Sequence, residues 1–172
     1  GFLLESVEHG ERWGRWSFVG RRPVATLVAR GPDITVEGDD PGAIEAVVDG
    51  IPLDEGMLAA VEALLARART PDDLDLPPLH GGLLGYLGYD VVREVEHLPD
   101  VPDDDHGLPD AILSVIGGVA AFDHWRQRVT LIANALVAPR ADDATIDAAY
   151  DAAVARLERM AADGARPLAE PL

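Results

Sequence analysis

The stretch FLLESVEHGERWGRWSFV, residues 2–19, decides the fold class of this chain. Two apolar-rich runs, residues 2–7 and 13–19, flank the turn-forming His9-Gly10-Glu11, a pattern typical of a β-hairpin. A connection this short joins antiparallel strands, because a parallel pair needs a crossover of about a dozen residues or more. The stretch therefore predicts antiparallel β-structure at the start of the chain.

The residues that follow extend this pattern. Residues 25–29 and 34–37 flank Gly31-Pro32-Asp33, a second hairpin signal, and together the four runs suggest an antiparallel sheet. Apolar spacing and turn signals then predict a helix over residues 54–69 with Asp54 as its N-cap, a strand and a turn over 81–89, a short helix over 90–96, a loop over 98–109, strands over 113–122 and 129–137, and a helix over 143–162. Hairpins mixed with helices predict the α+β class, with antiparallel sheets and flanking helices.

The composition excludes several classes of protein. The chain has 172 residues, which suits roughly one domain, and 48% of them are hydrophobic, so we expect a folded core. No apolar run approaches the ~18 residues that a membrane span needs, and the first residues do not have the basic and then apolar regions expected of a secretory signal. The absence of cysteine excludes disulfides and thiolate chemistry. A net charge of −17, without a basic patch, argues against nucleic acid as a partner.

Two motif-like patterns do not support a ligand site. Gly82, Gly85 and Gly88 miss the spacing of a dinucleotide-binding loop by one residue, and they fit a strand that packs closely against its neighbour. Asp100 and residues 103–105 lack the spacing of a calcium loop and are interpreted as a solvated acidic loop.

Catalytic residues are equally hard to find in the sequence. Two carboxylates lie near a histidine in the sequence, at Glu94, Glu96 and His97. This group could serve a small acidic hydrolase, but it is equally consistent with the charged end of a helix. No G-x-S-x-G motif occurs, and the three serines all lie in predicted strands. The residues alone therefore show no self-sufficient catalytic constellation.

Several segments nevertheless resemble one known family. Residues 2–8 together with residues 12–20 resemble the start of the conserved part of anthranilate synthase component I, a member of the chorismate-utilising enzymes. Residues 81–93, GGLLGYLGYDVVR, resemble that family's second N-terminal signature. Leu108-Pro109-Asp110 and Phe122-Asp123-His124 fall where family members carry similar residues. The resemblance runs in collinear order over nearly the whole chain.

The resemblance implies a regulatory N-terminal domain over residues 1–165, truncated at its start, and a linker over residues 166–172 toward an absent C-terminal chorismate-binding domain. The parent protein is then expected to be a cytoplasmic lyase that makes anthranilate and pyruvate from chorismate and ammonia, with Mg²⁺. A separate glutamine amidotransferase subunit would supply the ammonia. The family's catalytic groups and metal ligands belong to the C-terminal domain, so no catalytic or metal residue is assigned here, and the chain alone is expected to be inactive.

The resemblance also implies an effector site. The family's Leu-Leu-Glu-Ser motif contributes to feedback inhibition by L-tryptophan, and it matches residues 3–6 without a gap. Tryptophan presents an ammonium, a carboxylate and an indole, which need acceptors, donors and an apolar wall. Ser6 offers a hydroxyl, Glu5 a carboxylate and Leu4 an apolar side chain, so these three residues are the expected effector ligands. In a regular strand, Glu5 and Ser6 point to opposite faces.

Other interpretations remain open at this stage. Trp13 and Trp16 are expected to lie in the core, with stacking in the effector pocket as the alternative. The nearest rival function is component I of aminodeoxychorismate synthase, in folate synthesis, which belongs to the same superfamily. A rival from another class is a non-enzymatic module that binds an amino acid.

Overall fold

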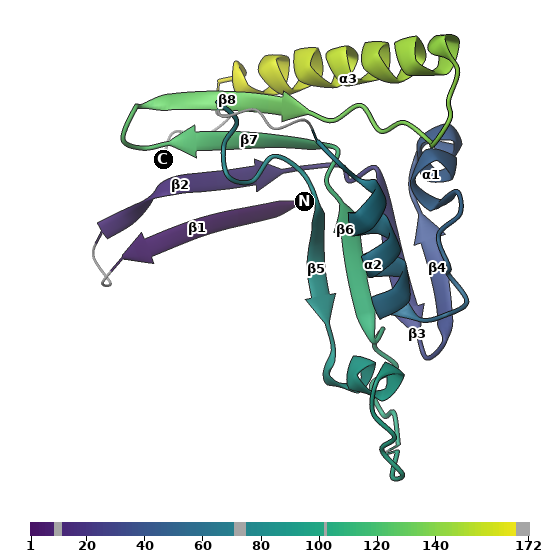
Figure 1. The fold of residues 1–172 in the computed structure, drawn as a ribbon. Helices are drawn as coiled ribbons and strands as arrows, with labels where there is room; N and C mark the ends of the chain where they lie inside the picture. The colour runs from purple at the N-terminus through teal and green to yellow at the C-terminus, as the bar shows by residue number, and fades with distance from the viewer. Residues whose placement is uncertain (9–11, 71–74, 102, 168–172) are drawn as a thin grey trace. The chain divides into compact units, whose positions relative to one another are not determined.

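The computed structural model describes residues 1–8, 12–70, 75–101 and 103–167 (Figure 1), and it describes the side chains of all of these except residues 6–8, 12 and 13. The chain forms two compact units. Unit 1 comprises Gly1–Arg22, Asp75–Gly81 and Gly117–Leu172, and unit 2 comprises Pro23–Leu74 and Gly82–Ile116. Each unit is built on a four-stranded antiparallel sheet with flanking helices, so the predicted α+β class is confirmed.

Unit 1 joins strands from the two ends of the chain. Its sheet has the order β1-β2-β7-β8, formed by β1 (Phe2–Glu8), β2 (Arg12–Gly20), β7 (Gly118–Asp123) and β8 (Arg128–Ala133). Helix α3 (Asp143–Gly164) follows, and the carboxylate of its N-cap, Asp142, accepts a hydrogen bond from Thr145 N at 2.9 Å. The predicted turn at residues 9–11 and most of the predicted linker, residues 168–172, lie outside the described residues.

Helix α3 packs on one face of this sheet because its inner side meets small residues there. A Cβ atom on Gly118 would lie 3.1 Å from Met160 Sδ, so the glycine permits a close approach of helix and strand. Arg156 Nη1 donates to the carbonyl oxygens of Gly117 and Asn134, at 3.2 Å each. Ala153 is buried in the same helix. One face of the sheet in unit 1 is thus covered at β7 and β8.

Unit 2 has the strand order β4-β3-β6-β5, formed by β3 (Ala25–Arg30), β4 (Asp33–Glu37), β5 (Leu83–Leu87) and β6 (Ala111–Val115). It also contains helices α1 (Pro41–Val48) and α2 (Met57–Arg67) and the 3-10 helix η1 (Tyr89–Glu94). Alternate residues of β3 and β6 are buried, and Leu27 and Met57 are fully enclosed. This alternation is the period-2 pattern of a sheet with one face in a core.

Two helix boundaries differ from the sequence predictions. Asp54 is not an N-cap: α2 begins at Met57 after Gly56, which provides no side-chain cap. The carboxylate of Glu94 instead accepts hydrogen bonds from Met57 N and Leu58 N, at 2.8 Å each. The cap comes from a residue far away in the sequence, which local spacing does not reveal. The short helix predicted over residues 90–96 is η1, which has 3-10 rather than α geometry.

Helix α1 was not predicted, although its start has a local signal. Asp40 precedes Pro41 and accepts hydrogen bonds from Gly42 N and Ala43 N, at 3.0 and 3.3 Å. An acidic N-cap before a proline at the first helical position is a recognised start of a helix. The other end of α1 is satisfied by Arg67 of α2, whose guanidinium donates to the carbonyl oxygens of Ala46, Val47 and Asp49.

Most predicted strands lie where they were expected, but the one predicted over residues 129–137 is β8, which ends at Ala133, and the predicted pairing of strands was wrong. The hairpins β1–β2 and β3–β4 belong to different sheets rather than to one. The single strand predicted over residues 113–122 is two strands, because β6 ends at Val115 in unit 2 and β7 begins at Gly118 in unit 1. The expectation for the glycine pattern is confirmed at Gly85, where an added Cβ would overlap the carbonyl oxygen of Ile112 on the neighbouring strand β6.

Candidate functional site

The candidate effector residues lie on β1, at the edge of the sheet in unit 1. Leu4 is 40% exposed and Glu5 is also exposed. Leu4 pairs with Phe18 and Glu5 pairs with Ser17 on β2. Directly paired residues share a face of an antiparallel sheet, so Leu4 and Glu5 belong to opposite faces. The motif therefore presents an apolar and an acidic side chain on two different surfaces.

Ser6 lies in β1 at the point where the pairing changes. The register with β2 shifts between Glu5 and Val7, so regular alternation does not continue across this position. The side chains of Ser6 and Trp13 lie outside the described residues, and the predicted opposition of Glu5 and Ser6 therefore remains a prediction.

A polar row continues from Glu5 across the sheet. Ser17 is buried, at 5% exposure, and its Oγ lies 2.7 Å from Nε2 of the exposed His124. His124 N also donates to Arg15 O at 2.9 Å, which extends the pairing of β2 with β7 by one residue. Because Glu5 pairs with Ser17, and Ser17 with Phe122, the carboxylate and the hydroxyl share one face. The sequence placed both Ser17 and His124 in family-like segments, but it gave neither of them a partner or a role in the site.

The opposite face carries an aromatic surface. The rings of Trp16 and Phe18 are stacked, with centroids 6.0 Å apart and an interplanar angle of 14°. Both residues are half-buried, and Leu4 pairs with Phe18. Trp16 is therefore neither enclosed in a core nor fully exposed, and with Leu4 it forms an apolar wall of the kind that an indole ring can contact.

Arg15, on β2, and Asp123, at the end of β7, form an ion pair between the two strands. Arg15 donates to the Asp123 carboxylate from Nε at 3.2 Å and from Nη2 at 2.8 Å. Asp123 is 1% exposed and also accepts from Trp125 N and Arg126 N, at 3.2 Å each. The hydrogen bond from Arg15 is the largest cause that lowers the Asp123 pKa to about 2, against an opposing effect of burial. The same pairing raises the pKa of Arg15.

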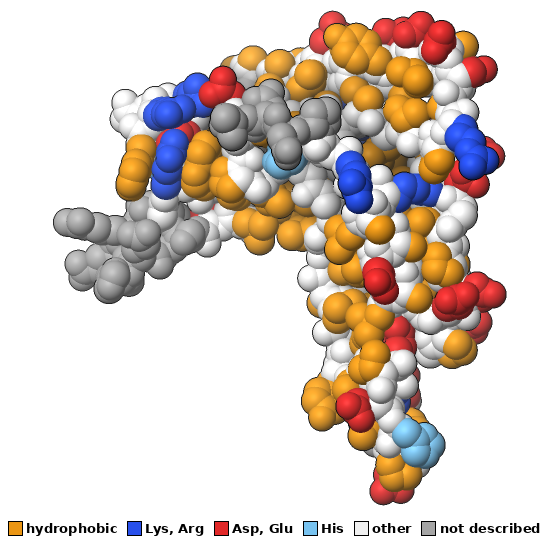
Figure 2. All heavy atoms as spheres, in the orientation of Figure 1, with side chains coloured by type: hydrophobic (Ala, Val, Ile, Leu, Met, Phe, Trp, Pro, Cys, Tyr) orange, Lys and Arg blue, Asp and Glu red, His pale blue; other side chains and the backbone are white. Residues whose placement is uncertain are grey.

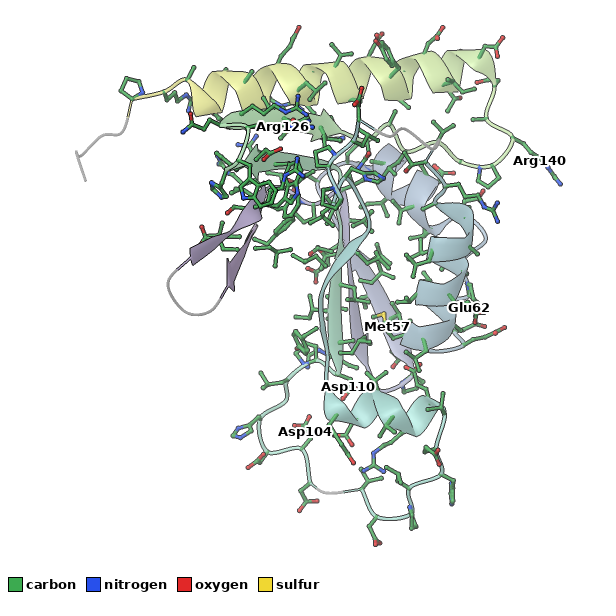
Figure 3. All side chains as sticks on the ribbon, turned by 60° about the vertical axis from the view of Figure 1, so that its left-hand side comes forward. Met57, Glu62, Asp104, Asp110, Arg126 and Arg140 are labelled. Carbon is green, nitrogen blue, oxygen red and sulfur yellow. The ribbon has the colours of Figure 1, made fainter. Side chains whose placement is uncertain are left out.

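The Arg15 guanidinium also lies over two indole rings. It is 4.9 Å from the centroid of Trp16 and 5.4 Å from that of Trp125, which is 77% exposed. Figure 3 shows Arg126 beside this group, with its Nε 4.0 Å from Asp123 Oδ2. A buried aspartate between a bidentate arginine and two backbone donors is a fixed anion rather than a proton-transfer group. Its role here is to position Arg15 and the aromatic side chains.

The alternative catalytic group is not assembled in unit 2. Glu94 is occupied as the cap of α2, and no hydrogen bond or ion pair joins it to Glu96 or His97 among the described residues. Within the same part of the chain, no group of three or more His, Cys, Asp or Glu residues is arranged to hold a metal ion. None of the helices described is both long and apolar enough to cross a membrane.

Comparisons with known proteins give one consistent result. No protein-family model matches the chain. It is 41% identical over 167 residues to anthranilate synthase component 1 of Mycolicibacterium smegmatis, covering 97% of this chain and 30% of that protein. The protein of the same name from Mycobacterium tuberculosis is 44% identical over 170 residues, covering 97% and 31% respectively. The chain thus spans less than a third of the length of these relatives.

A solved structure supports the fold independently. The crystal structure of anthranilate synthase component I from Streptococcus pneumoniae superposes with a TM-score of 0.59 at 20% identity. The match covers 98% of this chain and 32% of that one. At this identity the likeness concerns the fold alone, and it agrees with the two antiparallel sheets and their helices.

Proposed function

We propose that this chain, which belongs by its sequence to the anthranilate synthase component 1 family, is the N-terminal, regulatory part of such an enzyme. It spans about 30% of the length of its relative. The observation that carries the proposal is 41% identity over 97% of the chain. The parent protein would convert chorismate and glutamine-derived ammonia into anthranilate and pyruvate, as a lyase of tryptophan biosynthesis acting in the cytoplasm.

This part of the protein would regulate rather than catalyse. The described residues do not fit the Mg²⁺ that the reaction uses, because they offer no group of three or more suitable ligands. On the family resemblance, we place the metal and the reacting groups in a chorismate-binding domain beyond residues 1–172, joined through a linker over residues 166–172. The 172-residue chain alone would be inactive, and no step of the reaction is assigned to it.

We further propose that Leu4, Glu5 and Ser6 take part in binding L-tryptophan. The exposed Glu5 carboxylate can accept hydrogen bonds from the ligand's ammonium group, and the Ser6 hydroxyl can donate or accept. Leu4, with the half-buried Trp16 and Phe18, offers an apolar wall for the indole. Because Leu4 and Glu5 lie on opposite faces of an edge strand, a ligand that contacts both would span the edge of β1.

Inhibition would follow from preferential binding to one arrangement of the enzyme. Tryptophan can shift an equilibrium only by its difference in affinity for two states, so it must bind best to the arrangement that binds chorismate poorly. A coupling of about 1–3 kcal/mol, or roughly 5–150-fold in affinity, is typical of such linkage.

The test uses the complete protein that carries this chain, supplied with chorismate, an ammonium salt and Mg²⁺. We expect anthranilate fluorescence to appear, and L-tryptophan to suppress it. Formation of aminodeoxychorismate without release of pyruvate would overturn the proposal in favour of the folate branch. Absence of turnover, with tryptophan still bound, would leave a non-enzymatic amino-acid-binding module.

A further inference from the structure

Arg15 lies in an irregular part of β2, directly across from the candidate effector residue Ser6. The residues of β2 that pair with Glu5 and Val7 are four positions apart, whereas regular pairing would place them two apart. Ser6, which lies between these two residues of β1, is therefore opposite residues 14–16 of β2. A bulge of this kind breaks the alternation of side chains and redirects the side chain within it. The bulge thus places Arg15 next to the effector strand.

The guanidinium of Arg15 has donors to spare. It carries five N–H groups. Its Nε and Nη2 donate to the Asp123 carboxylate at 3.2 and 2.8 Å, whereas Nη1 has no hydrogen-bond partner in the part of the chain that the structure describes. The side chain is 34% exposed. The edge of the guanidinium that faces away from Asp123 can therefore donate to a second carboxylate, in the two-point geometry that arginine favours.

The protein itself holds this guanidinium in place. Asp123 is 1% exposed and also accepts hydrogen bonds from two backbone N–H groups, so its carboxylate is fixed. The guanidinium lies over the rings of Trp16 and Trp125, 4.9 and 5.4 Å from their centroids. An arginine that is already ordered loses little rotamer freedom when it binds a ligand.

The charge around Arg15 favours a ligand with one negative charge. Arg126 Nε lies 4.0 Å from Asp123 Oδ2, so two guanidinium groups share one carboxylate and one positive charge is left over. Figure 2 shows arginine side chains among hydrophobic ones at the left end of the sheet of unit 1. The net charge of the chain, −17, opposes ligands that carry several negative charges. The group therefore suits a single carboxylate better than a phosphate or a polyanion.

The neighbours of Arg15 favour a ligand that also carries an aromatic ring. Trp125 is 77% exposed, and the half-buried ring of Trp16 is stacked with that of Phe18. Such rings contact a further ring in stacked or edge-to-face geometry. A ligand whose carboxylate lies on Arg15 can place its ring on this aromatic surface. The chemistry of the group thus fits an aromatic monocarboxylate.

We propose that Arg15 binds the carboxylate of the aromatic amino-acid effector, and that Asp123 is the residue that positions it. The inference rests on the proposed function, in which L-tryptophan binds at Leu4, Glu5 and Ser6. Those three residues offer no positive charge to the ligand's carboxylate, and Arg15 supplies it from the neighbouring strand. The ammonium group then belongs to β1 and the carboxylate to β2.

The experiment compares L-tryptophan with L-tryptophanamide, in which a neutral amide replaces the carboxylate. Calorimetric titration of the complete protein at about pH 6, where both ligands carry a protonated amino group, gives the two dissociation constants. The variant is Arg15→Lys, which keeps a positive charge beside Asp123 but lacks the second edge of the guanidinium. The matched control is Arg128→Lys, the same change at an exposed arginine where β8 begins.

We expect the wild type to bind L-tryptophan about tenfold or more tightly than the amide, since a charge-assisted pair is lost with the carboxylate. Arg15→Lys should lose most of this preference, and Arg128→Lys should keep it. A purely structural role of Arg15 would weaken both ligands alike and leave their ratio unchanged, which would overturn the proposal.

The wild type alone can also overturn the proposal, whatever the stability of Arg15→Lys. If a carboxylate from elsewhere in the complete protein occupied Arg15, the wild type would bind L-tryptophan and its amide equally. A wild type that binds anthranilate but not L-tryptophan would contradict the assignment to the effector. Absence of any binding of L-tryptophan would instead overturn the proposed regulatory function.

Discussion

Arg15 and Asp123 form a two-point ion pair, 3.2 and 2.8 Å long, although they lie 108 positions apart in the chain and Asp123 is 1% exposed. The pair joins the second strand of the chain to its seventh. The same contact places the guanidinium over Trp16 and Trp125. The position of Arg15 beside the aromatic side of the candidate effector site therefore depends on Asp123.

The ion pair predicts how stability depends on pH. The pKa of Asp123 is about 2 in the folded chain and near its ordinary value of 3.8 when unfolded, chiefly because Arg15 stabilises the carboxylate. A lowered folded pKa gives stability that is present above the unfolded value and is lost as the pH falls through the window from about 4 to about 2. We expect the urea midpoint to drop more across this window in the wild type than in Asp123→Asn.

At neutral pH, Asp123→Asn should itself unfold at lower urea, because the Arg15 pair is lost. Asp105→Asn is the matched control, since the Asp105 side chain is 81% exposed. Parallel pH profiles of the wild type and Asp123→Asn would contradict this account.

The hydrogen bond between Ser17 and His124 predicts an energetic coupling. In a double-mutant cycle with Ser17→Ala and His124→Ala, we expect an interaction free energy of about 0.5–1.5 kcal/mol from urea unfolding. Ser17 is 5% exposed, so in the folded chain its hydroxyl has little contact with water to compete with this hydrogen bond. His106→Ala, at an exposed histidine of unit 2, should show no coupling to Ser17→Ala. An interaction free energy of zero between Ser17→Ala and His124→Ala would show that the two side chains do not stabilise each other.

The cap that Glu94 provides predicts a local effect on α2. Glu94→Ala leaves Met57 N and Leu58 N without their acceptors and should lower the free energy of unfolding by about 0.5–2 kcal/mol, the usual cost of losing an N-cap. Glu96→Ala removes an exposed carboxylate of the same segment and should change it little. Equal effects of the two substitutions in urea unfolding would show that the cap contributes nothing.

The proposed effector site predicts a change in inhibition by tryptophan. In the complete protein, Ser6→Phe should raise the half-inhibitory tryptophan concentration, by up to the ~5–150-fold that such coupling typically supplies. Ser6→Thr keeps the hydroxyl and should have a smaller effect. Anthranilate formation measured over a tryptophan titration checks both. Loss of turnover with unchanged inhibition would refute the assignment.

The local chemistry of this sequence predicted where most elements lie. Residues 143–162 were expected as a helix and form most of α3, and the two N-terminal hairpins follow their turn signals. Prediction failed where a distant residue decides the outcome. Asp54 is of a residue type that often caps helices, yet α2 starts at Met57. The acceptor for the Met57 N–H group is the carboxylate of Glu94, 37 positions away.

The candidate site could likewise be predicted from local sequence only in part. The resemblance of residues 3–6 to a family motif pointed to Leu4 and Glu5, which lie exposed on an edge strand. Ser17 and His124 were not assigned, because 107 positions separate them and only the pairing of β2 with β7 brings them together. The apolar run over residues 113–122 likewise has no local mark of the change from one sheet to the other.

The interleaving of the two units has a consequence for synthesis on the ribosome. β1 and β2 are made before unit 2, but their partner β7 begins at Gly118, after all of unit 2 has been made. Until then the inner edge of β2 has no strand to pair with, and an unpaired edge is a site for association between nascent chains. Unit 2 can complete its sheet once β6 has emerged. The order of folding is thus expected to run from the middle of the chain outward, with the effector strand finding its place in the sheet last.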